Sequence, residues 1–180
     1  VFAPGLMSGT AASTSGRLSV GCKSPLTGGI KEANTGGTAA QAMARLGYAA
    51  IILEGERKGD DLYKIVIDKD SVTFHKANEL VDKLKLVHGD KVTYVTIGTA
   101  GEMRMGNSTI CVTDPECRPT RHAGRGGVGA VMGSKGIKAI VLDPAGTKNR
   151  EPANPDQFRT ANQAFASGLK SHPVTGQGLP

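Results

Sequence analysis

The sequence predicts an α+β fold, namely a β-rich domain built by internal duplication, with a short helix after each of two glycine-rich loops. Two observations support this class. A twelve-residue segment occurs twice, and a glycine pair precedes each copy. In addition, short apolar runs with strand composition alternate with turn residues along most of the chain. Two copies are too few for a solenoid, so we expect two similar halves inside one domain.

The repeat aligns residues 43–54, MARLGYAAIILE, with residues 132–143, MGSKGIKAIVLD, without gaps. The glycine pairs, Gly36-Gly37 and Gly126-Gly127, are one residue out of register with it. Further upstream, Thr-Ser-Gly at 14–16 resembles Thr-Ala-Gly at 99–101. We therefore place the duplicated halves at about 14–54 and 99–143, within a domain spanning 1–143.

Each copy predicts a helix, a glycine that ends it and a buried strand. These elements are residues 38–46, Gly47 and residues 49–54 in the first copy, and residues 128–135, Gly136 and residues 138–143 in the second. We expect Met43 and Met132 to lie in the core.

Between the copies, residues 63–67 and 71–75 predict a β-hairpin. Asn78 is expected to cap a helix over 79–87 that has Leu80, Val81, Leu84 and Val87 on one face. Residues 92–97 and 109–113 predict two further strands.

The tail has a different composition. Residues 144–155 form a polar, proline-containing linker, and a helix is expected from Pro155 to about Lys170. Its apolar face is thin, so we expect residues 156–180 to begin a following helical domain. Both ends are expected to be cuts within a longer protein, with the domain incomplete at its N-terminus.

Composition excludes several classes of protein. The three cysteines, Cys22, Cys111 and Cys117, are too few and too irregular for a disulfide framework or a zinc site. No segment has the roughly 20 apolar residues of a membrane span. The net charge of +6 is dispersed and aromatic residues are scarce, which argues against nucleic-acid binding. A cytoplasmic protein without a nucleic-acid or membrane partner is expected.

Residues 124–129, GRGGVG, match the pattern of a dinucleotide-binding loop. That motif requires an apolar parallel strand leading into its first glycine. The preceding segment, residues 115–123, contains two prolines and several charged residues, which a central strand does not tolerate. We therefore do not predict a dinucleotide fold, although a non-redox phosphate- or dinucleotide-binding module remains the alternative.

Glycine-rich turns before helices expose backbone N–H groups to anions, and Arg17, Arg121 and Arg125 could add charge-assisted hydrogen bonds to phosphate. The glycines could equally serve only to allow tight loops and close packing. The residues alone leave these two interpretations open.

Four motifs in order carry a family resemblance: GRLSV at 16–20, KSPLTGGI at 23–30, EANTGG at 32–37 and HAGRGGVGAVMGSK at 122–135. Together they resemble the N-terminal domain of the aldehyde ferredoxin oxidoreductase family. The resemblance covers residues 1 to about 143, and the tail resembles the start of the family's second domain.

The resemblance implies a domain on which a tungsten- or molybdenum-bis-pterin cofactor lies, with its phosphates held through Mg²⁺. Asn34 and Ala123 would offer backbone carbonyls to the Mg²⁺. The cofactor-binding residues would be Arg17, Asn34, Thr35, Gly36, Gly37, His122, Ala123, Gly124, Arg125 and Gly126. No catalytic residue is assigned to this chain.

The family activity implied is oxidation of an aldehyde to a carboxylic acid. Electrons would pass through a [4Fe–4S] cluster to ferredoxin or an electron-transfer subunit. Cluster ligands would come from the remaining domains of the parent chain, because Cys111 and Cys117 supply too few thiolates. The resemblance also implies a homo-oligomer, and this segment alone is not expected to be active.

Overall fold

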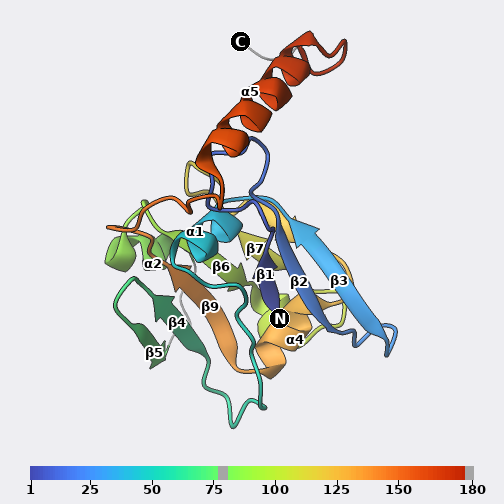
Figure 1. The fold of residues 1–180 in the computed structure, drawn as a ribbon. Coiled ribbons are helices and arrows are strands. Elements are labelled where there is room, and N and C mark those ends of the chain that lie inside the picture. The colour runs from blue at the N-terminus through green and yellow to red at the C-terminus, as the bar shows by residue number, and fades with distance from the viewer. Residues whose placement is uncertain (77–80, 177–180) are drawn as a thin grey trace.

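A computed structural model describes residues 1–76 and 81–176. Its strands form a three-stranded sheet ordered β1-β2-β3 and a six-stranded sheet ordered β5-β4-β9-β6-β7-β8 (Figure 1). The strands are β1 (Phe2–Pro4), β2 (Leu18–Lys23), β3 (Ile30–Thr35), β4 (Tyr63–Ile67), β5 (Val72–Lys76), β6 (Thr93–Ile97), β7 (Ile110–Val112), β8 (Arg121–Ala123) and β9 (Ile137–Leu142). The helices are α1 (Ala39–Arg45), α2 (Val81–His88), α3 (Thr99–Glu102), α4 (Val128–Ser134) and α5 (Pro155–Ser171).

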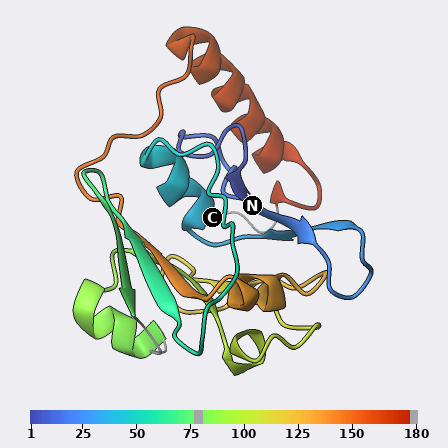
Figure 2. The same ribbon diagram turned by 90° about the horizontal axis from the view of Figure 1, so that it is seen from below.

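One main hydrophobic core lies between the two sheets and includes side chains of α1 and α4 (Figure 2). Met43 and Met132 are almost fully buried in this core, as predicted. A smaller cluster on the other face of the large sheet packs under α2 around Tyr94 and Leu84. The large sheet is therefore covered on both faces.

The two halves repeat one topology. In the first, β1, β2 and β3 pair antiparallel in order and lead into α1; in the second, β6, β7 and β8 do the same and lead into α4. The loop between the last strand and the helix cap contains two residues in the first half and three in the second. The pair Gly36-Gly37 ends before the cap of α1, whereas the pair Gly126-Gly127 includes the cap of α4, and this is the shift of one residue seen in the sequence.

The helices and glycine stops of the repeat are confirmed, because α1 and α4 lie within the predicted ranges and Gly47 and Gly136 adopt positive φ. The strand predicted at 138–143 is confirmed as β9. The strand predicted at 49–54 is wrong, since only Ile51 forms a bridge there, with Phe2. The two segments differ in the strands that pair with them. Strand β9 lies between two strands and is buried throughout, whereas the segment at Ile51 pairs only with the short strand β1.

The elements between the copies are confirmed as the β4–β5 hairpin and the strands β6 and β7. The side chain of Asp68 accepts backbone N–H bonds from Asp70 and Ser71 and so shapes the hairpin turn. Asn78, Glu79 and Leu80 lie outside the described residues. Leu84 is buried as expected, but Val87 is 69% exposed, so its assignment to the buried face is wrong. Val87 lies about 60° around the helix axis from Leu84 and therefore does not share its buried position. The hydroxyl of Tyr94 donates to the Gly89 carbonyl at 2.6 Å and lies 3.3 Å from the Leu84 carbonyl.

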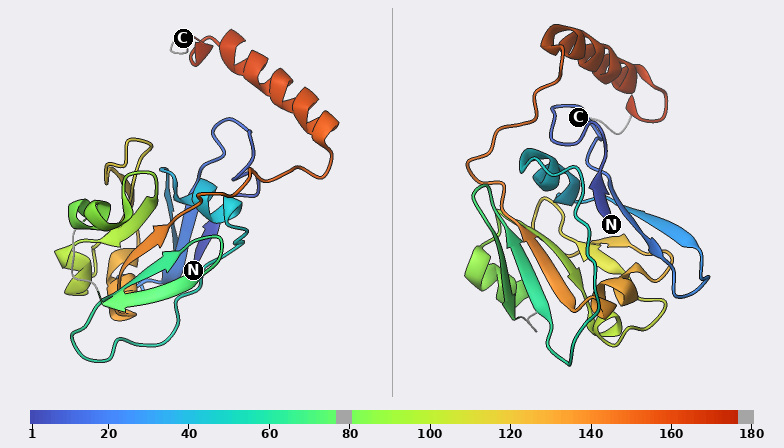
Figure 3. Two further views of the ribbon diagram at one scale, coloured as in Figure 1. Left: turned by 90° about the vertical axis from the view of Figure 1, so that its left-hand side faces the viewer. Right: turned by 60° about the horizontal axis from the view of Figure 1, so that its bottom comes forward.

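Helix α5 projects from the body of the domain (Figure 3), and none of its residues is buried. It begins at the predicted proline, and the Asn154 side chain caps it by accepting the Gln157 N–H at 3.0 Å. It contacts the loop near Ala11, including a 3.5 Å hydrogen bond from Asn162. None of the helices in the described ranges is long and apolar enough to cross a membrane.

Candidate functional site

The residues predicted to bind the cofactor gather where the two sheets meet. Strand β3 is an edge of the small sheet, strand β8 is an edge of the large sheet, and the two lie side by side. A glycine loop follows each strand, so both loops and the residues that precede them fall on one region of the surface. Sequence positions about 90 residues apart are brought together by the duplication.

Part of the glycine content serves close packing. A Cβ atom on Gly37, where φ is +93°, would lie 2.6 Å from the Thr113 carbonyl oxygen, and one on Gly126 would lie 2.8 Å from Lys31 Cβ. Such distances are not tolerated, so at these positions glycine is required by the fold. The packing interpretation is therefore correct for Gly37 and Gly126.

Gly36 and Gly124 differ from these glycines. A Cβ atom on Gly124 would have no neighbour closer than 3.8 Å. One on Gly36 would lie 3.7 Å from Arg17 Nη1 and 4.0 Å from Arg121 Cδ, which are ordinary contact distances. No steric conflict in this structure demands glycine at either place. A methyl group would therefore fit at both places, and at Gly36 it would contact two arginine side chains.

The surface of this region is cationic. Arg17, Arg121 and Arg125 are exposed, and in the described part of the chain none of their side chains forms an ion pair or a hydrogen bond. The carboxylate of Glu32 lies nearby but accepts a hydrogen bond from the Asn34 side-chain amide. The arginines can therefore donate to a bound anion in planar, two-pronged geometry.

The predicted magnesium ligands are oxygen atoms of the backbone. Asn34 lies in edge strand β3 and Ala123 ends edge strand β8. Edge strands carry backbone groups that are not paired within their own sheet. Hard Mg²⁺ prefers such oxygen ligands together with phosphate and water. The donor set is consistent with Mg²⁺ and phosphate at this edge.

His122 occupies the opposite face of β8 from the buried Ala123 side chain. It is paired across the strands with Cys111, and its Nδ1 lies 3.1 Å from Thr109 Oγ1. The imidazole borders a pocket of about 250 Å³ that Cys111 and Lys138 also line. The structure therefore brings the His122 backbone to the glycine loop and directs its side chain to the other face of the large sheet.

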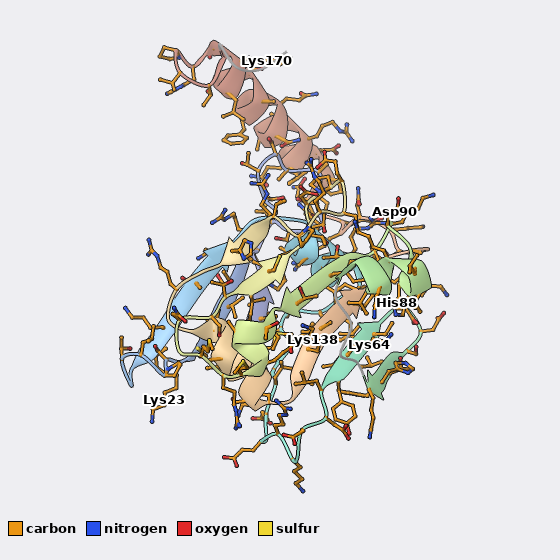
Figure 4. All side chains as sticks on the ribbon, turned by 180° about the vertical axis from the view of Figure 1, so that it is seen from behind. Lys23, Lys64, His88, Asp90, Lys138 and Lys170 are labelled. Atoms are coloured by element: carbon orange, nitrogen blue, oxygen red, sulfur yellow. The ribbon has the colours of Figure 1, made fainter. Side chains whose placement is uncertain are left out.

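Lys138 is a residue near this pocket that the sequence analysis did not single out. It lies in β9 beside Lys64 of β4 (Figure 4) and is only 1% exposed. Its ammonium donates to the Ile97 carbonyl at 2.6 Å and to the Glu102 carboxylate. A charge inside the apolar run IKAIVL was the signal that could have identified it.

The cysteines are separate from one another. Cys22, Cys111 and Cys117 are all free thiols, and within the described ranges no three His, Cys, Asp or Glu side chains gather as a set of metal ligands. Burial raises the pKa of Cys111 to about 11 and also raises that of Cys22. Both thiols are half-buried rather than fully buried, and their raised pKa values oppose nucleophilic reactivity.

The loop at 124–129 does not belong to a dinucleotide-binding fold. The strand that leads into it, β8, has three residues, is antiparallel to β7 and lies at the edge of the sheet. A dinucleotide motif requires a parallel strand inside the sheet at this place. The sequence prediction against that fold is confirmed.

Comparison with known proteins agrees with the resemblance. Residues 1–144 match the family described as "Aldehyde ferredoxin oxidoreductase, N-terminal domain". The whole chain is similar to the tungsten-containing aldehyde ferredoxin oxidoreductases of Pyrococcus horikoshii, at 40% identity, and Pyrococcus furiosus, at 37% identity. In both cases it spans 30% of the relative's length.

A solved structure is similar as well. The active-site complex BamBC of benzoyl coenzyme A reductase, in complex with 1,5-dienoyl-CoA, superimposes with a TM-score of 0.84 at 30% identity. The similarity covers 94% of this chain and 26% of that chain. Fold, motif order and sequence identity therefore agree, and the chain belongs to the aldehyde ferredoxin oxidoreductase family, of which it carries the N-terminal domain.

Proposed function

We propose that this chain is the cofactor-binding part of a tungsten–pterin oxidoreductase that converts aldehydes to carboxylic acids. The main support is a cationic surface of Arg17 and Arg125 beside two glycine loops, without anionic partners in the described part of the chain. The relatives' names specify tungsten, which favours it over molybdenum. Because the chain spans 30% of their length, the activity is a property of the longer protein.

The residues of the chain would bind and orient the cofactor. The Arg17 and Arg125 guanidinium groups would donate to phosphate oxygens, and the carbonyls of Asn34 and Ala123 would bind Mg²⁺ that joins those phosphates. The lack of a side chain at Gly36 and Gly124 would let the cofactor approach the backbone, with Thr35 and His122 in the adjoining strands and Gly37 and Gly126 in the same loops. The bound metal–pterin group would supply the two-electron redox chemistry.

We further propose that residues 1–143 form the metallopterin-binding domain, 144–155 a linker and 156–180 the start of a helical domain. The lack of buried residues in α5 supports this division. The remaining domains would hold the [4Fe–4S] cluster and contact ferredoxin or an electron-transfer subunit. A cytoplasmic homo-oligomer that takes an aldehyde substrate is the corresponding proposal for the parent protein.

The test is the metal content of the protein produced at its full natural length and purified without oxygen. Mass spectrometry should find about one tungsten atom per chain, and Arg17→Ala and Arg125→Ala should each lower that number. Arg159→Ala, in an exposed position on α5, is the matched control and should leave it unchanged. A full-length protein without tungsten or molybdenum, made where a known relative loads fully, would favour a non-redox phosphate-binding module instead.

A further inference from the structure

Arg121 is a site residue that the family resemblance leaves unassigned. It begins strand β8 in the large sheet, while Arg17 precedes β2 in the small sheet. Both side chains reach Gly36, where Arg17 Nη1 and Arg121 Cδ lie within 4.0 Å of one point beside the backbone. Two arginine side chains from different halves of the duplicated domain therefore converge at one position.

The guanidinium groups at the ends of these two side chains repel each other where no anion lies near them. Within the described ranges neither the Arg17 nor the Arg121 side chain forms an ion pair or a hydrogen bond, and Glu32, the carboxylate in the neighbouring strand, is bound to Asn34. Some arginines elsewhere in the chain do have acidic partners; Arg118, for example, lies 3.1 Å from Asp114. The side chains of Arg17 and Arg121 have no such partner in the described part of the chain.

The two sheets meet beneath these arginines. Strands β3 and β8 lie side by side, but they belong to different sheets and form no β-ladder with each other. An anion that accepts hydrogen bonds from both arginines would connect the two sheets across this junction. A phosphate group has the charge and the number of oxygen atoms to accept from two guanidinium groups at once.

We propose that Arg17 and Arg121 form an arginine clamp that binds one phosphate group above Gly36 and ties the two halves of the domain together. The identity of the phosphate's carrier, the pterin cofactor, rests on the proposed function. The clamp itself rests on the convergence of the two side chains and on the missing counter-charge. Arg121 is then a positioning residue that acts by holding the phosphate.

The clamp is tested with the full-length protein made without tungsten, with inorganic pyrophosphate as the probe. Calorimetry should show that Arg121→Ala and Arg17→Ala each weaken binding about tenfold or more, and that Arg159→Ala does not. If one phosphate contacts both side chains, the affinity of the double variant for pyrophosphate falls by less than the product of the two single-variant factors. Pyrophosphate should also raise the thermal midpoint of the wild type more than chloride does at equal ionic strength.

Arg121→Lys keeps the positive charge but lacks the planar guanidinium group, and it should bind pyrophosphate with intermediate affinity. This variant shows that weaker binding by Arg121→Ala is not caused by misfolding. The clamp would be refuted if Arg121→Ala bound pyrophosphate as tightly as the wild type. It would also be refuted if the affinity of the double variant fell by the full product of the two single-variant factors. Tungsten and organic phosphate content of the loaded protein then identify the carrier. If Arg17→Ala lowers the tungsten content and Arg121→Ala does not, the clamp is refuted and the proposed function stands. Pyrophosphate binding through both arginines in a protein that never contains tungsten or molybdenum keeps the clamp and refutes the proposed function.

Discussion

Gly37 packs directly against the backbone carbonyl of Thr113, where the first glycine loop crosses the end of β7. The same carbonyl oxygen accepts the Thr38 backbone N–H at 3.0 Å and the Thr38 hydroxyl at 3.2 Å. This contact joins the two halves of the duplicated domain near the candidate site. Gly37 and its neighbour Gly36 thus have different roles although they are adjacent.

Gly37→Ala is predicted to destabilise the protein by about 2–5 kcal/mol, because the new methyl group would clash with the Thr113 carbonyl at a positive φ. Gly36→Ala meets only ordinary contacts and should change the free energy of unfolding by less than about 1 kcal/mol. Chemical denaturation of both variants measures the difference. Equal stabilities for the two variants would contradict this assignment of roles.

The buried lysine predicts a second stability effect. Lys138→Met removes the partner of Glu102 and of the Ile97 carbonyl inside a nearly closed site. Because Glu102 is 28% exposed, we expect the free energy of unfolding to fall by about 2–4 kcal/mol, somewhat less than for a fully buried ion pair. Glu102→Gln keeps an oxygen acceptor and should cost less. Urea unfolding that shows Lys138→Met within about 0.5 kcal/mol of the wild type would refute a structural role for the pair.

The sequence predicts the local elements of this fold well, because each of them follows from nearby residues. The helix, the glycine stop and the apolar run occur in both copies, and both helices form as expected. The fate of the apolar run depends on distant residues. In the second copy it lies between β4 and β6, whereas in the first it meets only Phe2. Similar sequence patterns can therefore form a strand in one copy and an irregular segment in the other.

For the candidate site, the motif order predicts the two loops, and the duplication explains why they meet. The sequence could not show which of the glycines are required for packing, and the structure was needed to distinguish them. Gly37 touches a carbonyl 76 positions further along the chain, at Thr113, and no local pattern reveals this contact. The convergence of Arg17 and Arg121 on Gly36 is of the same kind. The composition shows that arginines are present but does not show which of them lack an acidic neighbour.

The raised pKa of Cys111, about 11, predicts slow alkylation. At pH 8 its thiolate fraction should be about a hundredfold lower than that of a thiol with the ordinary value of 9.0. Iodoacetamide labelling followed by peptide mass spectrometry should therefore give a rate for Cys111 that keeps rising up to about pH 11. A plateau near pH 9 would show that burial does not control this thiol.

Asp114 predicts a pH-dependent contribution to stability. Burial by itself raises the pKa of this carboxyl, but hydrogen bonds from the Arg118 backbone and the Thr120 hydroxyl, together with the Arg118 charge, outweigh it and hold the pKa below its ordinary value of 3.8. The contacts measure 2.8 Å from Arg118 N, 3.1 Å from Arg118 Nε and 3.0 Å from Thr120 Oγ1. The folded state therefore favours the ionised carboxylate.

Because the pKa is lower in the folded state than in the unfolded state, this stabilisation is complete above the unfolded value and is lost as the pH falls through the folded value. Asp114→Asn should be less stable than the wild type at pH 7, and the difference should shrink below about pH 4. Denaturant unfolding of both proteins across this range measures it. A difference that stays constant down to pH 2 would mean that the hydrogen-bond acceptor lost in the Asn variant, rather than the carboxylate charge, accounts for the effect.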